Sequence, residues 1–373
     1  MPLWLFAMIK VMKIIVVAGG QGTKLWPYSR EHQPKQFQPV FGDVSLCTKT
    51  VTILLKKFAA EDIFISTKRK FIKYVSEQAP QISLRNYIVE PDTPKDTGPG
   101  HGLAFLRLSV EYPNEPFFLV QVDCVREPEA AFLQMIEDAG KLVERDKKLL
   151  SGGMKATRPV MGNDYLRLGE RITGTKQEIY QVAEFMGRRT SVNETIHLIE
   201  NFHVVLHTNH YCWYPGLMID AYKKYRPDWH KAFMKMKEAF GKPGEDVAIE
   251  KIYNNMEAGS TEEVTRHLME AGEVGIVLLP FRWTDVGTWS SVYDFFVDGS
   301  GSGNYEDGNI VTDATTGSII KTSNLKKLVA VAGVEDLVIV DTDDILLVVP
   351  KDKLEKIKDI QQLLRDQGAV EYL

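Results

Sequence analysis

The chain has 373 residues, of which 44% are hydrophobic, and its 45 Lys and Arg against 50 Asp and Glu give a net charge of -5. This apolar content excludes a largely disordered chain, and the length predicts two or three domains at roughly 150 residues each. The mildly acidic balance argues against a nucleic-acid binder, although it leaves room for a local basic pocket around phosphates.

The N-terminal residues begin like a signal peptide, but Lys10 and Lys13 interrupt the apolar run and no small-residue cleavage site follows. Residues 1–12 are therefore interpreted as an N-terminal extension. No other run approaches the roughly 18 to 20 apolar residues that span a bilayer, so we expect no membrane partner. The three cysteines fit neither a disulfide framework nor a zinc site, which indicates a reducing, cytoplasmic compartment.

From residue 13 onward, short β-rich runs alternate with segments of helical periodicity. This alternation predicts an α/β fold with a doubly wound, mixed but mainly parallel sheet, whose ligands lie beyond the carboxyl ends of the strands. The predicted strands are 13–18, 63–66, 87–90 and 117–123, and the predicted helices are 48–59 and the segment whose face is marked by Leu103, Leu106 and Val110.

The character of the sequence changes near residue 300, after a run rich in glycine and serine. We predict a domain boundary there, with one domain over 13–300 and an all-β unit, a small β-coil, over 301–373. The coil is predicted to close with a helix in 351–368 that ends at Gly368. Its β-type segments are 308–313, 318–323, 327–333, 336–341 and 345–350.

Three glycines, Gly19, Gly20 and Gly22, follow the first strand directly and offer unobstructed backbone N–H groups to an anion such as phosphate. The dinucleotide-binding fingerprint fails because Leu25 stands where its last glycine belongs, and the Gly-Lys-Ser/Thr triplet of a P-loop is absent. An NAD(P)-dependent oxidoreductase is therefore disfavoured. A tight turn without a ligand stays open as the alternative.

Cationic residues follow this glycine loop closely, since Lys24, Arg30 and Lys35 are interleaved with the stiffening residues Pro27 and Pro34. A rigid cationic rim of this kind suits the charge that builds on a triphosphate as its leaving group departs. The alternative is a set of solvated surface cations.

The stretch AGGQGTKLWPYSREHQPKQF, residues 18–37, resembles the signature AGGxGTRLWPxSRxxxPKQF of the sugar-1-phosphate nucleotidylyltransferases, in their mannose-1-phosphate guanylyltransferase branch. Lys24 stands where the family usually has arginine, which keeps the charge and loses the bidentate fork. The resemblance implies a nucleotide-diphospho-sugar-transferase fold of Rossmann-like type with a left-handed β-helix-like coil. It implies catalytic roles for Lys24 on the β,γ-phosphates and Lys35 near the α-phosphate, and nucleotide binding by Gly19, Gly20, Gly22 and Thr23.

The segment EPDTPKDTGPGHGLA, residues 90–104, resembles the family's EPxxRNTAPA. The resemblance implies that Glu90, Asp96, Thr97 and Gly98 help to bind the nucleotide. Asp96 and Thr97 are also good helix-capping residues, and the two roles are compatible because a helix N-terminus attracts anions.

Two aspartates stand where the family binds its metal, Asp123 at the place of (S/A)DH and Asp285 in RWTDVGTW at the place of WxDxGxW. Mg²⁺ is usually held by one or two carboxylates together with phosphate oxygens and water, so the implied cofactor is Mg²⁺. Cys124 occupies the position where histidine is common. Loop-capping aspartates are the alternative.

The sugar-side motifs match less closely. RPVMGNDYLRLG resembles PETGYGYI, AEFMGRRT stands where FxEKP is expected, CWYPGLM stands for WNSGMF, and GEDVAIEK parallels SIDYAVME. These departures leave the identity of the sugar open. The residues implied to bind the sugar phosphate are Gly162, Tyr165, Arg188, Tyr214, Gly216 and Asp246.

The resemblance implies a Mg²⁺-dependent transfer of a guanylyl group from GTP to a sugar 1-phosphate, by default mannose 1-phosphate, which gives GDP-mannose and pyrophosphate. Two alternatives remain: another sugar or nucleotide, and a non-catalytic paralogue that binds a nucleotide sugar and regulates a partner. A homodimer is left open, because the edges of the β-coil provide unpaired strands.

Overall fold

The structure is a computed structural model that describes residues 12–20, 22–40, 42–160, 162–297 and 303–373. Most of the predicted N-terminal extension and most of the glycine- and serine-rich run near residue 300 lie outside these residues. The chain forms two compact units. Unit 1 comprises the chain up to Gly19, residues 51–121 and residues 126–283; unit 2 comprises residues 20–50, 122–125 and 284–373.

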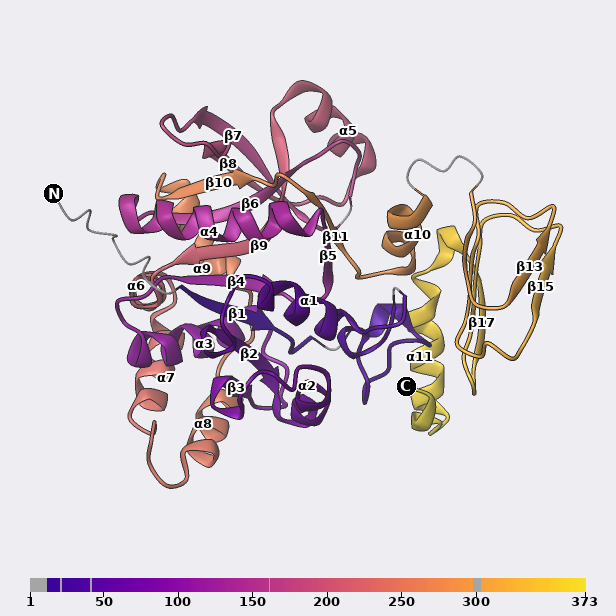
Figure 1. Cartoon of the computed structure of the whole chain (residues 1–373), viewed down its shortest axis with the longest axis horizontal. Helices are drawn as coiled ribbons and strands as arrows, with labels where there is room; N and C mark the ends of the chain where they lie inside the picture. The colour runs from indigo at the N-terminus through magenta and orange to yellow at the C-terminus, as the bar shows by residue number, and fades with distance from the viewer. Residues whose placement is uncertain (1–11, 21, 41, 161, 298–302) are drawn as a thin grey trace, which may run out of the picture. The chain divides into compact units, whose positions relative to one another are not determined.

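Unit 1 is built on a nine-stranded mixed sheet (Figure 1). In sheet order the strands are β3 (Tyr87–Glu90), β2 (Ile63–Lys68), β1 (Lys13–Val17), β4 (Phe117–Gln121), β9 (Val204–Trp213), β6 (Leu149–Lys155), β10 (Val274–Leu278), β8 (Ile179–Arg188) and β7 (Asp164–Arg171). The pairs β1–β2, β2–β3, β1–β4 and β6–β10 are parallel. Strand β9 runs antiparallel to β4, β6 and β7, and β8 runs antiparallel to β10 and β7.

The apolar runs of the sequence form the middle of this sheet. Ile14, Ile15 and Val16 of β1 are 0% exposed, as expected for a strand that is covered on both faces. The predicted α/β class with a mixed sheet is confirmed. The predicted helix 48–59 begins earlier and ends earlier, as α1 (Leu46–Leu55), because the chain leaves the helix in turns at Lys57 and Phe58.

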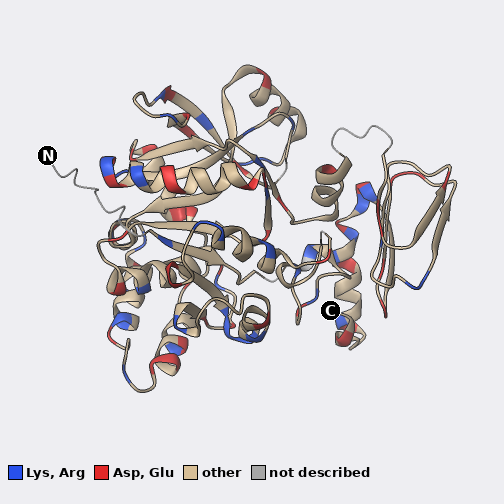
Figure 2. Cartoon of the chain, viewed as in Figure 1, with Lys and Arg blue, Asp and Glu red and all other residues tan. Residues whose placement is uncertain are grey.

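The helices of unit 1 are α2 (Ile72–Gln78), α3 (Thr97–Glu111), α4 (Glu129–Asp146), α5 (Val192–Asn201), α6 (Pro215–Tyr225), α7 (Pro227–Lys237), α8 (Glu245–Asn254) and α9 (Glu262–Glu270), with short 3-10 turns at Ala60–Asp62, Arg69–Phe71 and Leu84–Asn86. They pack on the sheet and on one another: α4 packs against β4, β6 and β9, and α3 packs against α6 and α7. Figure 2 shows basic residues at one end of α4. Arg145 lies in the last turn of this helix, where positive charge is favourable for the helix dipole.

Unit 2 contains the C-terminal coil. The elements of unit 2 are β12 (Tyr305–Asp307), β13 (Ile310–Asp313), β14 (Ile319–Thr322), β15 (Val329–Ala332), β16 (Leu337–Asp341), β17 (Leu346–Pro350), α10 (Trp289–Val297) and α11 (Lys356–Asp366), with 3-10 turns η1 (Thr23–Leu25), η2 (Lys35–Phe37), η6 (Lys351–Lys353) and η7 (Val370–Tyr372). In one sheet β12, β14 and β16 pair in parallel and β17 pairs antiparallel with β16; in a second sheet β13 and β15 pair in parallel. The predicted β-coil and its five predicted strands are confirmed.

The segment after the glycine loop shares one hydrophobic core with this coil. Trp26 and Trp289 both belong to that core, and Trp289 Nε1 donates to the Trp26 carbonyl at 3.1 Å. Trp26 Nε1 in turn donates to the Tyr372 carbonyl at 2.6 Å, and Arg30 pairs with Asp344 at 2.6 Å. The loop that carries the strongest motif is thus held by the end of the chain.

Two short strands, β5 (Cys124–Glu127) and β11 (Arg282–Asp285), pair with each other, and in each of them the chain passes from one unit to the other. The units therefore group the chain differently from the linear domains predicted over 13–300 and 301–373. Those boundaries stay predictions.

Close helix packing in unit 1 depends on glycines in α3. A Cβ at Gly102 would overlap the ring of Phe233 in α7, so we expect G102A to lower the free energy of unfolding by about 1–3 kcal/mol. The matched control is G216A in α6, where nothing lies within 4 Å of the added Cβ. That substitution should raise stability by about 0.5–1 kcal/mol. Urea unfolding of both variants measures this, and equal stability of the two would contradict the packing argument.

Candidate active site

A buried lysine lies between two aspartates in unit 2. Lys35, which is only 6% exposed, places its Nζ atom 2.8 Å from Asp123 Oδ2 and 3.5 Å from Asp285 Oδ1. Burial alone would lower the pKa of Lys35, but the two carboxylates raise it above its usual value. The side chain is therefore a fixed ammonium group at neutral pH.

Local structure explains why these three residues meet. Pro34 precedes η2 in an extended conformation, and Gln36 and Phe37 are buried on the same turn, which fixes the direction of Lys35. The Val286 N–H donates to the Asp123 carbonyl at 3.0 Å, and this bond ties the two aspartate segments together.

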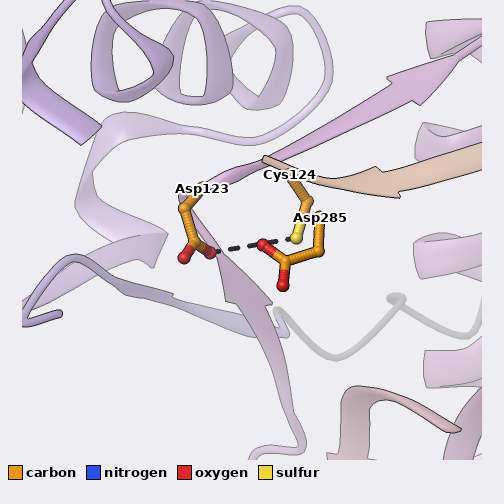
Figure 3. A group of neighbouring side chains, drawn as sticks. All are labelled: Asp123, Cys124 and Asp285. Carbon is orange, nitrogen blue, oxygen red and sulfur yellow. Dashed lines mark hydrogen bonds between the residues drawn. The ribbon is translucent and has the colours of Figure 1, made fainter. Parts of the chain in front are cut away.

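The two aspartates and Cys124 form a candidate metal centre (Figure 3). One ligand atom of each lies within 4.8 Å of the other two, and the described residues bring no other such trio of metal-ligating side chains together. The carboxylate oxygens fit the preference of Mg²⁺ for hard ligands, whereas the thiol sulfur is a soft ligand. The donor set therefore fits a divalent cation and does not by itself select magnesium.

The glycine loop needs glycine at one position for a specific reason. Gly22 has φ = +63°, and a Cβ there would lie 2.8 Å from Lys35 Cγ. The Gly20 carbonyl accepts a hydrogen bond from Gln36 Nε2 at 2.6 Å, so the loop is also tied to η2. Lys24 is exposed in η1, which Thr23 begins, and its charge acts on Asp285. The structure therefore brings Lys24, Lys35, Asp123 and Asp285 together.

In unit 1, Glu90 is a buried carboxyl group at the end of β3. It is 6% exposed and accepts a hydrogen bond from Ser66 Oγ at 2.8 Å. A Cβ at Gly19 would lie 3.4 Å from its Oε1 atom, and a Cβ at Gly100 would lie 2.9 Å from its Oε2 atom. The Glu90 carboxyl group thus lies close to Gly19, at the start of the glycine loop.

The start of α3 is capped from within the chain. Asp96, at φ = +63°, accepts from the Thr97 N–H at 2.6 Å, and the Gly98 N–H donates to the Gly259 carbonyl at 2.8 Å. The Thr97 hydroxyl accepts from the Thr261 N–H at 3.0 Å. The capping interpretation is confirmed, and nucleotide binding by these residues stays a prediction.

Two predicted sugar-phosphate residues lie together where β7 begins and β8 ends. Arg188 pairs with Asp164 in register, and its Nε atom lies 3.8 Å from an Asp164 carboxylate oxygen. Gly162, at φ = +80°, donates its N–H to the Arg189 carbonyl at 3.3 Å. Arg188 is exposed and available to an anion.

The predicted role of Tyr165 is not supported by its surroundings. The side chain is 0% exposed, and its hydroxyl accepts from the Val160 N–H at 2.8 Å. Its ring packs in a core cluster with Val204 and Leu206. The correction is that Tyr165 is a core residue that anchors the preceding loop, because its only polar side-chain atom is already used by that loop.

Two further predicted sugar residues, Tyr214 and Gly216, lie away from Asp164 and Arg188. Because β9 is antiparallel to β4, its last residue Trp213 pairs with Phe117, the first residue of β4. Tyr214 and Gly216 therefore follow at the edge opposite Gln121, and the Tyr214 hydroxyl accepts a hydrogen bond from Lys147 Nζ at 2.7 Å. Asp246 lies on α8, where its 72% exposed side chain is 3.9 Å from Arg69.

The sequence interpretation missed the polar interruption of β9, His-Thr-Asn-His at 207–210. Asn209 has φ = +52°, and its carbonyl accepts from Gln121 at the end of β4. Tyr165 pairs with Leu206, which places His207 next to Asp164 across the two strands. The signal in the sequence was four polar residues inside an otherwise apolar strand.

Glu262, the first residue of α9, was also missed. Burial lowers the pKa of His207 to about 4, and the charge of Glu262 opposes this shift. Burial likewise raises the pKa of Asp164, with Glu262 adding to the shift. Asp164 therefore lies beside Arg188 and next to His207, and the charge of Glu262 acts on both Asp164 and His207.

Two protein-family models match separate segments of the chain. The nucleotidyl transferase family model matches residues 13–299, and the MannoseP isomerase/GMP-like beta-helix domain model matches residues 308–364. The chain belongs to the nucleotidyl transferase family.

Individual relatives are more specific. The chain is 30% identical to a mannose-1-phosphate guanylyltransferase of Escherichia coli over 372 residues, 96% of this chain and 76% of the relative. It is 26% identical to the alginate biosynthesis protein AlgA of Pseudomonas aeruginosa over 366 residues, 96% of this chain and 73% of the relative. The resemblance found in the motifs is thereby confirmed.

The fold is also that of a solved structure. A protein of Thermus thermophilus, described as a mannose-1-phosphate geranyltransferase, superimposes with a TM-score of 0.82 at 24% identity, covering 95% of this chain and 99% of that chain. Among the described residues, every helix is too short or too polar to cross a bilayer.

The buried carboxyl group of Glu90 predicts a specific pH dependence of stability. Burial raises its pKa above the ordinary 4.5, against the opposing effects of Ser66, Lys68 and Tyr253. Stability from this group is present below pH 4.5 and is lost as the pH rises through the folded-state pKa. As the pH rises above 4.5, we expect the melting temperature of E90Q to fall less than that of the wild type.

Circular dichroism melts of wild type and E90Q across this pH range make the measurement. The control is E61Q, which alters an exposed carboxylate in the same unit and should follow the wild type. A wild-type pH profile in E90Q would mean that Glu90 ionises as readily in the folded as in the unfolded chain.

Proposed function

We propose that this chain transfers a guanylyl group from GTP to a sugar 1-phosphate, α-D-mannose 1-phosphate, giving GDP-mannose and pyrophosphate. The observation that carries the proposal is the buried Lys35 ammonium between Asp123 and Asp285, next to the exposed Lys24. The Lys35 ammonium can stabilise negative charge on a phosphate, and Asp123 and Asp285 can hold a cation that does the same, as the transfer of a nucleotidyl group requires. The relatives named mannose-1-phosphate guanylyltransferase support the choice of substrates.

The chemistry requires no covalent intermediate with the protein. A phosphate oxygen of the sugar 1-phosphate attacks the α-phosphorus of GTP in line, and pyrophosphate leaves. Lys35 stabilises charge at the α-phosphate and Lys24 stabilises charge on the leaving β,γ-phosphates, which are effects of positioning and electrostatics. Asp123 and Asp285 would hold Mg²⁺, which would supply positive charge against the phosphates.

The remaining residues are assigned to binding. Nucleotide binding is assigned to the backbone N–H groups of Gly19, Gly20, Gly22 and Thr23 and to residues 96–98. Arg188 binds the phosphate of the sugar substrate. We add His207 as a group for the sugar hydroxyls, because it lies next to Asp164 across the two strands, and Glu262, whose charge acts on both residues.

We also propose a cytoplasmic location and substrates limited to small molecules, with neither nucleic acid nor membrane as a partner. The three cysteines are buried and form no disulfide among the described residues, which supports a reducing compartment. A homodimer stays open.

The test is an assay of purified protein with Mg²⁺, all common nucleoside triphosphates and a panel of sugar 1-phosphates, read as pyrophosphate release. GTP with mannose 1-phosphate should turn over fastest. Faster turnover of another pair would replace the substrates. Tight binding of GDP-mannose without turnover would instead establish the non-catalytic alternative.

Loss of one metal carboxylate should remove catalysis. We expect D285N to lower kcat by about 100-fold or more, because both the cation and the orientation of Lys35 depend on this carboxylate. The control is D343N, an exposed aspartate of the same unit. Thermal melts of both variants show whether the folded state is retained, and wild-type turnover in a folded D285N protein would refute the assignment.

Lys24 supplies a positive charge whose geometry is less demanding. We expect K24R to keep turnover within about threefold, because arginine retains the charge, and K24Q to lower it about tenfold or more. Steady-state rates at saturating GTP provide the comparison. Equal rates for K24Q and wild type would show that Lys24 is an ordinary surface lysine.

A further inference from the structure

The candidate metal centre contains a ligand of a different kind from its two carboxylates. Cys124 begins β5, is 6% exposed, and places Sγ 3.8 Å from Asp123 Oδ1. Figure 3 shows its sulfur on the same side as both carboxylates. This residue follows Asp123 directly, so it reaches the centre without any change of the backbone.

We propose that Cys124 supplies a thiolate to the cation held by Asp123 and Asp285, so that the centre prefers borderline and soft divalent cations such as Co²⁺, Zn²⁺ and Cd²⁺ over Mg²⁺. The proposal rests on the proposed function, which places a cation at these carboxylates. It concerns the identity of that cation and the third protein ligand.

The geometry allows simultaneous contact. A cation about 2.3 Å from sulfur and about 2.1 Å from oxygen joins donors up to about 4.4 Å apart. The three ligand atoms lie within 4.8 Å of one another, so small rotations of the aspartate side chains bring all three into range. Mg²⁺, in contrast, gains little from sulfur, because it prefers hard oxygen ligands.

Binding through Cys124 forms one sulfur–metal bond and releases the thiol proton to solvent.

The other two cysteines provide an internal control. Cys47 and Cys212 are at most 1% exposed, and neither belongs to a metal-ligating trio among the described residues. Burial raises the pKa of the Cys47 thiol to about 12. The double variant C47S/C212S therefore leaves Cys124 as the sole cysteine sulfur without touching the proposed site.

Titration of the C47S/C212S protein with Co²⁺ tests the proposal. We expect a sulfur-to-cobalt charge-transfer band in the near ultraviolet that saturates at one equivalent. The band should disappear in C47S/C124S/C212S. Affinity for Co²⁺ should fall at least about tenfold, since even outer-shell partners of metal ligands contribute that much. Mg²⁺ affinity should change little. Absence of the band, or its persistence without Cys124, overturns the proposal.

Cadmium NMR of C47S/C212S gives a second measurement that does not require the C124S change to fold. A resonance in the region of sulfur-bound cadmium supports the proposal, and one in the all-oxygen region overturns it. The result is separable from the proposed function. Turnover with Mg²⁺ but no sulfur–metal signal refutes the thiolate alone, whereas a sulfur–metal signal without turnover refutes the enzymatic function alone.

Discussion

The ion pairs of Lys35 are the interaction on which the candidate active site depends. A buried ammonium group is costly unless carboxylates surround it, and Asp123 and Asp285 meet this need from segments far apart in the sequence. The same two carboxylates are the residues that can hold a cation. The lysine thus keeps the aspartates close together, and the aspartates keep the lysine charged, before any substrate binds.

The C-terminal coil contributes to this arrangement through packing. Trp26 in the loop donates to the Tyr372 carbonyl, and Trp289 donates to the Trp26 carbonyl, so the loop segment is enclosed by residues that lie far along the chain. Asp285 leads directly into α10, which begins with Trp289. The coil therefore helps to hold the segment that carries Lys24 and Lys35 within unit 2.

Prediction from sequence succeeded where local patterns decide the structure. Buried strands such as β1 are continuous apolar runs, Asp96 is a recognisable cap, and Gly368 ends the final helix region at φ = +73°. Asp123 and Asp285 were singled out by motifs around them, and the structure places both carboxylates at Lys35, while their role in binding a metal stays a prediction. The family assignment followed from the same motif.

Prediction failed where strand direction and burial decide. Short matches around Tyr214 and Gly216 carried no information that β9 ends beside the beginning of β4. A motif match likewise did not reveal that the Tyr165 hydroxyl is consumed by Val160. Asn209 was missed because a left-handed residue within a strand leaves no clear periodic signal, although the polar run around it did mark the place.

Gly22 and Lys35 illustrate how constraint is shared along the chain. Because a side chain at position 22 would occupy the space of the Lys35 stem, the two positions form one steric unit although they are well separated in the sequence. The backbone adds a second constraint, because Gly22 has φ = +63° and a Cβ there would also lie 3.2 Å from the residue 35 backbone nitrogen. A shorter side chain at position 35 would therefore remove only part of the requirement for glycine at position 22.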